Sequence, residues 1–156
     1  MPSDVALTLR LATMKDADLL WAWRNDPEVV AQTFSGAEVG REEHIDWLAR
    51  TLDDPGARIY VVEAAREPFG QVRLTTDEHE TVEVHISLAE SARGSGVGRK
   101  VLRLAAERAA SDLGASVVVA KIMPSNERSL RAFLGAGFHE RQRSSEAVVL
   151  ERRTLD

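Results

Sequence analysis

The chain has 156 residues, of which 44% are hydrophobic, so it has the length of one ordinary domain and enough apolar side chains for a sizeable core. Its formal net charge of −5 disfavours a nucleic-acid partner, because contacts to many phosphates require a basic face. It lacks cysteine, which excludes disulfides, thiolate metal sites and cysteine nucleophiles. Residues 1–5 show no export signal, and no apolar run approaches the ~20 residues of a membrane span. These features predict one cytoplasmic domain over residues 1–156 with no membrane partner.

The first third of the chain predicts a strand followed by two helices. Apolar residues occupy every second position of residues 5–11, which is the period of a half-buried strand. Thr13 can cap a helix that continues until Asn25-Asp26-Pro27 interrupts it. Residues 41–52 carry an apolar stripe with helical spacing, so a second helix is expected there.

The middle of the chain predicts three strands. Residues 59–64 and 71–75 form the first two, around a turn at residues 66–68. The clearest strand is 81–88, in which apolar and polar side chains alternate. Its polar face consists of Glu83, His85 and Ser87. That face is a candidate place for chemistry.

The last third alternates helices with strands. Apolar spacing predicts a helix over residues 98–113, and Gly114 suits its end. Residues 116–122 predict a strand, residues 125–134 a helix and residues 147–151 a further strand. The resulting order, βααβββαβαβ, indicates an α/β fold.

A glycine-rich turn, Arg93-Gly94-Ser95-Gly96-Val97-Gly98, lies between the clearest strand and the helix that follows it. Glycines let backbone N–H groups converge on an anion at the positive end of a helix dipole, so the turn predicts a phosphate-bearing ligand. The dinucleotide pattern G-x-G-x-x-G fails, because Arg99 and Val101 stand where its last glycine is required. The nucleoside-triphosphate pattern G-x-x-x-x-G-K-[ST] fails as well.

A second motif lies downstream, where Asn126 to Phe138 reads N-x-x-S-x-x-x-F-x-x-x-G-F. Together with the R-x-x-G-x-G turn, it resembles the GNAT superfamily of acetyl-CoA-dependent N-acetyltransferases, and the resemblance covers nearly the whole chain. It implies a central mixed sheet of six to seven strands, splayed at the cofactor site and flanked by about four helices. It also implies acetyl-CoA as cosubstrate and no metal.

The resemblance assigns the cofactor contacts. The residues expected to bind the pyrophosphate are Arg93, Gly94, Ser95, Gly96, Val97, Gly98 and Arg99. The backbone of Leu88 would polarise the thioester, and Asn126 would contact the pantetheine arm. The residues alone also allow a plainer interpretation, in which the glycines form a helix-starting turn and Asn126 caps a helix.

Two polar residues of the clearest strand are candidates for removing the proton of the acceptor amine. Glu83 can act through a water, and His85 titrates near neutrality; each is otherwise an ordinary polar residue on a partly wet strand face. Many family members have a tyrosine as general acid where this chain has Phe133, and the single tyrosine, Tyr60, lies on an earlier strand. Coenzyme A could leave as the thiolate, since a thiol has a pKa near 8.5.

The first third of the chain should select the acceptor. Its residues 21–29 and 42–48 resemble a GNAT branch that contains ribosomal-protein N-terminal, polyamine and nucleotide-linked amino-sugar acetyltransferases. Arg24, His44 and Trp47 are the candidate substrate-binding residues, although surface ion pairing and core packing are the ordinary roles of such side chains. We expect direct acetyl transfer to a small primary amine such as a nucleotide-linked amino sugar. A peptide N-terminus, a polyamine, and a non-catalytic acyl-CoA sensor stay open, as does a homodimer.

Overall fold

The computed structural model describes residues 6–77 and 80–155. Its strands are β1 (Leu7–Leu11), β2 (Ala57–Ala64), β3 (Glu67–Thr76), β4 (Thr81–Leu88), β5 (Val117–Ile122), β6 (His139–Arg143) and β7 (Val148–Arg153). Its α-helices are α1 (Ala17–Arg24), α2 (Pro27–Ala31), α3 (Arg41–Asp53), α4 (Val97–Leu113) and α5 (Glu127–Gly135), with 3-10 turns η1 (Met14–Asp16) and η2 (Glu90–Ala92). Val5, where the first predicted strand begins, and the rest of residues 1–5 lie outside the described residues.

All seven strands form one sheet in the order β1-β2-β3-β4-β5-β7-β6. Five of the six neighbouring pairs are antiparallel, and the β4–β5 pair is parallel. The predicted mixed sheet of six to seven strands is therefore confirmed. Parallel neighbours need a crossover, which here is α4.

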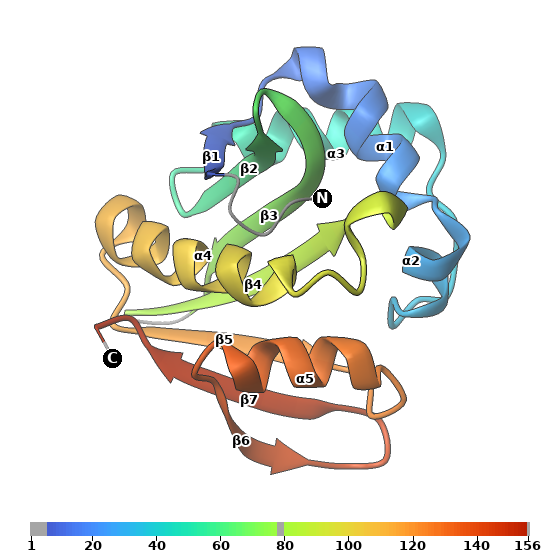
Figure 1. The fold of residues 1–156 in the computed structure, drawn as a ribbon. Helices are drawn as coiled ribbons and strands as arrows, with labels where there is room; N and C mark the ends of the chain where they lie inside the picture. The colour runs from blue at the N-terminus through green and yellow to red at the C-terminus, as the bar shows by residue number, and fades with distance from the viewer. Residues whose placement is uncertain (1–5, 78–79, 156) are drawn as a thin grey trace.

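The sheet splays between β4 and β5. Their register pairs Thr81–Glu83 with Val117–Val119 and stops there, although β4 continues to Leu88 and β5 to Ile122. Figure 1 shows the two strands diverging towards the end at which α4 and α5 begin. Backbone groups on the inner edges of the separated segments can therefore pair with a ligand.

Helices cover both faces of the sheet (Figure 1). The larger apolar core lies under α4 and α5 and includes Val84, Leu102 and Phe133. A smaller core on the other face joins α1 and α3 to β2 and includes Leu20, Leu48, Ile59 and Val61. Among the described residues, no helix combines the length and apolar character that crossing a membrane requires.

Strand alternation places the polar residues of β3 and β4 on one face. The cross-strand pairs Gln71–Ser87, Arg73–His85 and Thr75–Glu83 share that face, and Val82 and Val84 point to the α4 face. Arg73 is also opposite Ile59 of β2, so the polar pairs continue the face that α1 and α3 cover.

Three local features differ from the sequence-based expectation. Asn25-Asp26-Pro27 interrupts α1 but also starts α2, because Asp26 caps that helix and Pro27 takes its first position. The β2–β3 turn is centred on Ala65 and Arg66, which both have positive φ. Strand β6 was not predicted, because all five of its residues are exposed and show no apolar alternation.

Candidate active site

The glycine turn is open to a ligand. Gly94 and Gly96 have φ values of 75° and 80°, a backbone region that favours glycine. Gly96 is the N-cap residue of α4 and provides no side-chain cap for the first N–H groups of that helix. A Cβ on Gly94 would meet nothing within 4 Å, and one on Gly96 would meet only the Arg99 guanidinium, 3.7 Å away. This end of α4 fits a pyrophosphate in shape and in charge.

The other residues of the turn hold it in place. Ser95 Oγ donates a hydrogen bond to the Ala92 carbonyl at 2.6 Å, and Val97 is buried. Gly98 lies where α4 approaches α5 and β4, because a Cβ there would be 3.5 Å from the Ala132 Cβ. These contacts fix the direction in which the first turn of α4 points.

The Arg93 side chain is held by polar contacts to other parts of the protein. Its Nε donates to the Leu88 carbonyl at 3.0 Å, its Nη1 to Glu28 at 2.8 Å, and its Nη2 lies 3.2 Å from an Asp26 carboxylate oxygen. The side chain is 13% exposed, and the Arg93 N–H donates to the Glu90 carbonyl. Arg93 therefore ties the start of α2 to the end of β4.

The end of β4 presents backbone to the splayed gap. The Ala89 N–H donates to the Phe69 carbonyl at 2.7 Å, and so points towards β3. Because successive residues of a strand direct their polar groups to opposite edges, the Leu88 N–H points away from β3, towards the gap left by β5. That is the place where a thioester carbonyl would need a hydrogen-bond donor.

Asn126 begins α5 beside the same gap. Its side-chain oxygen accepts a hydrogen bond from the Ser129 N–H at 3.3 Å, which makes it the N-cap. This cap uses the amide oxygen and leaves the amide nitrogen as a donor that the cap does not engage. The helix-cap interpretation is confirmed, and it is compatible with a cofactor contact.

Glu83 and His85 form a pair on the polar face of β4. His85 Nε2 lies 2.9 Å from Glu83 Oε1, and Lys121 Nζ lies 3.9 Å from Glu83 Oε2. The hydrogen bond from His85, together with the nearby Lys121 and Arg73 charges, lowers the pKa of the Glu83 carboxyl below its ordinary value against the effect of burial. Glu83 is therefore an ionised acceptor that orients the imidazole, and a neutral His85 that donates from Nε2 keeps Nδ1 as an acceptor.

The three predicted acceptor residues gather around Arg73, which the sequence analysis did not single out. The His44 and Trp47 rings are 5.1 Å apart, and the Arg73 guanidinium lies 5.2 Å from the Trp47 ring. Arg24 is close enough to affect the pKa of His44 and that of Arg73. Polar and apolar side chains alternate along residues 71–75 with the same period of two that identified Glu83 and His85. This alternation was the signal that could have identified Arg73.

The loop between α2 and α3 is fastened to α1. Trp21 Nε1 and Asn25 Nδ2 both donate to the Val39 carbonyl at 2.7 Å, and the Val39 N–H donates to Asn25 at 2.8 Å. The Arg24 guanidinium reaches Ser35 at 3.4 Å. This loop therefore closes one side of the acceptor region.

Neither Phe133, which has no proton to donate, nor Tyr60 provides a general acid for this site. Phe133 is 1% exposed and packs edge-on against Phe138. Tyr60 lies in the core under α4, where its hydroxyl donates to Asp112 at 2.5 Å and burial raises its pKa. Protonation of the leaving thiolate is thus not assigned to either ring.

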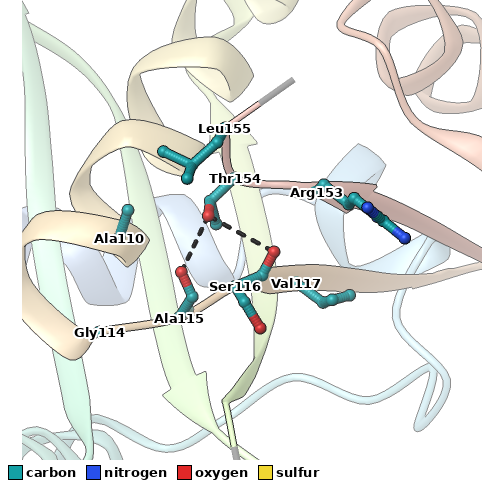
Figure 2. A pocket seen from close by; sticks show the side chains of 8 residues that line it. All are labelled: Ala110, Gly114, Ala115, Ser116, Val117, Arg153, Thr154 and Leu155. Carbon is teal, nitrogen blue, oxygen red and sulfur yellow. Dashed lines mark hydrogen bonds between the residues drawn. The ribbon is translucent and has the colours of Figure 1, made fainter.

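A separate hollow of about 500 Å³ lies at the other end of α4 (Figure 2). Its lining is formed by Ala110, Gly114, Ala115, Ser116, Val117, Arg153, Thr154 and Leu155. Thr154 Oγ1 donates to the Ala115 carbonyl at 2.9 Å, which fastens the chain after β7 to the start of β5. A 17-residue helix spans about 25 Å, so this hollow is remote from the glycine turn.

A family model described as Acetyltransferase (GNAT) domain matches residues 6–139. The fold is similar to that of spermidine N-acetyltransferase from Vibrio cholerae, solved in complex with CoA and spermine, with a TM-score of 0.87, 19% identity and 96% of each chain covered. Aminoglycoside acetyltransferase AAC(6')-Ib in complex with ribostamycin and coenzyme A gives a TM-score of 0.83 at 22% identity, over 95% of this chain and 93% of that chain.

A domain from Methanocaldococcus jannaschii DSM 2661 is also similar, with a TM-score of 0.84 and 22% identity over 96% of this chain and 99% of that chain. No curated protein sequence matches the chain. At these identities, the solved structures show that the fold is shared.

Proposed function

The chain belongs to the GNAT acetyltransferases and is an acetyl-CoA-dependent N-acetyltransferase, and we propose that it moves the acetyl group directly to the primary amine of a small molecule. The observation that carries this proposal is the Glu83–His85 pair, which lies where β4 and β5 separate. No cysteine is present to form a thioester with the enzyme. In the proposed mechanism, transfer proceeds in a ternary complex of enzyme, acetyl-CoA and acceptor, without a covalent enzyme intermediate.

The cofactor contacts follow from the backbone. Acetyl-CoA supplies an activated acyl carbon and a thiol leaving group. The N–H groups of residues 94–98 and the N-terminus of α4 would hold the pyrophosphate, with Arg99 adding positive charge. The Leu88 N–H would donate to the thioester carbonyl, and the Asn126 amide nitrogen would bind the pantetheine arm. Arg93 would support the turn from below through its contacts to Leu88, Asp26 and Glu28.

Proton removal is assigned to the pair on β4. His85 Nδ1 accepts a proton from the acceptor ammonium, and the ionised Glu83 holds the imidazole and stabilises the imidazolium. The free amine then forms a bond to the acyl carbon while the carbon–sulfur bond breaks, and the new amide nitrogen releases its remaining extra proton to solvent water. The leaving group departs as a thiolate, since a thiol pKa near 8.5 does not demand an acid at neutral pH. This accounts for a phenylalanine at position 133.

Two classes of small acceptor are supported by different observations. The neighbouring side chains of Arg24, His44 and Trp47 offer cationic and aromatic groups, which suit a nucleotide-linked amino sugar. A polyamine is the second candidate, because the similar enzyme from Vibrio cholerae is a spermidine N-acetyltransferase bound to spermine. A peptide N-terminus is a third class.

An assay of thiol release from acetyl-CoA tests the activity. The panel contains nucleotide-linked amino sugars, spermidine and short peptides, and we expect release that depends on one class of acceptor. His85→Ala should abolish most of that release without changing coenzyme A binding measured by calorimetry. Tight coenzyme binding with no release for any acceptor would instead support a sensor of acyl-CoA.

A further inference from the structure

Three cationic or titratable side chains from separate elements meet beside the catalytic pair. They are Arg24 at the end of α1, His44 in the first turns of α3 and Arg73 on β3. His44 is 4% exposed, and the Trp47 ring lies 5.1 Å from the His44 ring and 5.2 Å from the Arg73 guanidinium. The cluster is therefore held in place by packing rather than spread over a wet surface.

Two polar atoms of this cluster are buried without a partner. Arg24 Nη1 and His44 Nδ1 have no hydrogen-bond partner among the described residues. A buried polar atom that is left unpaired destabilises a fold by about 1–3 kcal/mol, so native structures rarely keep one without a use. Both atoms suit an acidic ligand, because a guanidinium donates and a protonated imidazole nitrogen donates.

Within residues 6–77 and 80–155, no direct ion pair balances the two arginines of the cluster. Among the described residues, no carboxylate oxygen lies within 4.0 Å of the Arg24 or the Arg73 guanidinium. Glu83 attracts Arg73 from further away, and the two arginines repel each other. Burial lowers the pKa of His44, and the positive charges of these two arginines lower it further. Such a site repels a polycation and attracts an anion.

From this geometry we propose that the acceptor carries an acidic group, a phosphate or a carboxylate, in addition to its amine, and that Arg24, His44 and Arg73 bind that group. The inference rests on the proposed function and names its substrate class. Arg73 is directly opposite His85 in the β3–β4 register, and such pairs have Cβ atoms about 5 Å apart. Allowing for side-chain reach, the amine and the acidic group lie on the order of 5–10 Å apart, which fits one small molecule such as an amino-sugar phosphate or a short amino acid.

Matched acceptors test the proposal through thiol release. Glucosamine 6-phosphate is compared with glucosamine, 5-aminovalerate with pentylamine, and spermidine serves as the polycation. We expect kcat/KM at least tenfold higher for the acidic member of one pair, and which pair responds identifies the group as phosphate or carboxylate. Equal rates within both pairs, or a preference for spermidine, would overturn the inference while leaving acetyl transfer established.

Variants locate the effect in the cluster. Arg73→Gln and Arg24→Gln should each reduce the preference for the acidic acceptor about tenfold, whereas the charge-retaining Arg73→Lys should keep part of it. Arg50→Gln on α3, which removes an exposed arginine, is the control and should keep the whole preference. An unchanged preference in both glutamine variants would contradict the assignment of the site.

A binding measurement separates failure of this inference from failure of the proposed function. With coenzyme A saturating the glycine turn, inorganic phosphate is titrated into the wild type and into Arg73→Gln, and heat is measured. Binding by the wild type that weakens about tenfold in the variant supports an acidic subsite even if no amine is acetylated. No phosphate binding by the wild type, together with turnover of neutral amines, would contradict the acidic subsite while leaving the acetyltransferase activity established.

Discussion

The cofactor end and the acceptor end of this molecule are built from different parts of the polypeptide. The glycine turn uses backbone N–H groups of consecutive residues at the start of α4, and its side chains mainly brace it. The acceptor region uses side chains from α1, α3, β3 and β4, which are far apart in sequence. A site made from backbone suits a ligand that stays the same, and a site made from side chains can change its specificity by single substitutions.

The first prediction concerns the Glu83–His85 pair, which we propose removes the proton of the acceptor amine. His85→Ala should lower kcat by about 10² to 10⁴-fold, because a positioned base contributes that much to amine transfer. Glu83→Gln should lower kcat less and displace the rising limb of the kcat–pH profile, since it removes the carboxylate that orients the imidazole. His139→Ala on β6 removes an exposed histidine and serves as the control. If both variants of the pair kept the wild-type kcat, the general base would have to be another residue.

The glycine turn and the cap of α5 were predictable because each signature is contiguous in sequence. The turn from Arg93 to Gly98 and the segment from Asn126 to Phe138 each show their spacing within one short stretch of sequence. Strand 81–88 was equally readable, since half-burial imposes a period of two. The splay, inferred from family resemblance alone, is visible in the register that ends at Glu83 and Val119.

The acceptor end was predictable only in part. The acceptor-binding role of Arg24, His44 and Trp47 stays a prediction, and their meeting with Arg73 depends on how α1 and α3 pack across β2 and β3, which no local pattern encodes. The role of the Arg93 side chain was also hidden, because its partners Asp26 and Glu28 lie more than sixty residues earlier. Edge strand β6 has no buried face to impose a period.

Arg93 joins the two ends, and its substitution should mostly affect stability. Arg93→Gln removes a charged hydrogen bond to the Leu88 carbonyl and the ion pair with Asp26, so we expect a loss of about 2 kcal/mol in the free energy of unfolding. In thermal unfolding this is a Tm lower by roughly 4–8 °C. If Tm stays constant while the KM for acetyl-CoA rises, the guanidinium contacts the cofactor instead of tying α2 to β4.

Alanine variants of two glycines at opposite ends of α4 distinguish the effect of backbone strain on stability from an effect on cofactor binding. Gly96 and Gly114 both have positive φ and no close neighbour for a Cβ, so alanine at either position should destabilise the fold by about 1 kcal/mol. Gly96→Ala should in addition raise the KM for acetyl-CoA about tenfold, because it crowds the N–H groups that we propose bind the pyrophosphate. An equal KM in the two variants would show that the turn does not bind the cofactor.

The smallest expected effect is the pH dependence that His44 gives to stability. Its pKa in the folded state lies below the ordinary 6.5, because burial and the charges of Arg24 and Arg73 disfavour the imidazolium. Below pH 6.5 the unfolded chain therefore binds more protons at this residue than the folded chain, and stability falls as the pH falls, by at most about 1.4 kcal/mol per pH unit. Urea unfolding at pH 7.0 and 5.5 measures the loss, and His44→Gln should reduce it. Inorganic phosphate should also reduce it in the wild type, since an anion beside His44 favours its protonated form, and a loss that phosphate leaves unchanged in the wild type would count against an acidic ligand at this cluster.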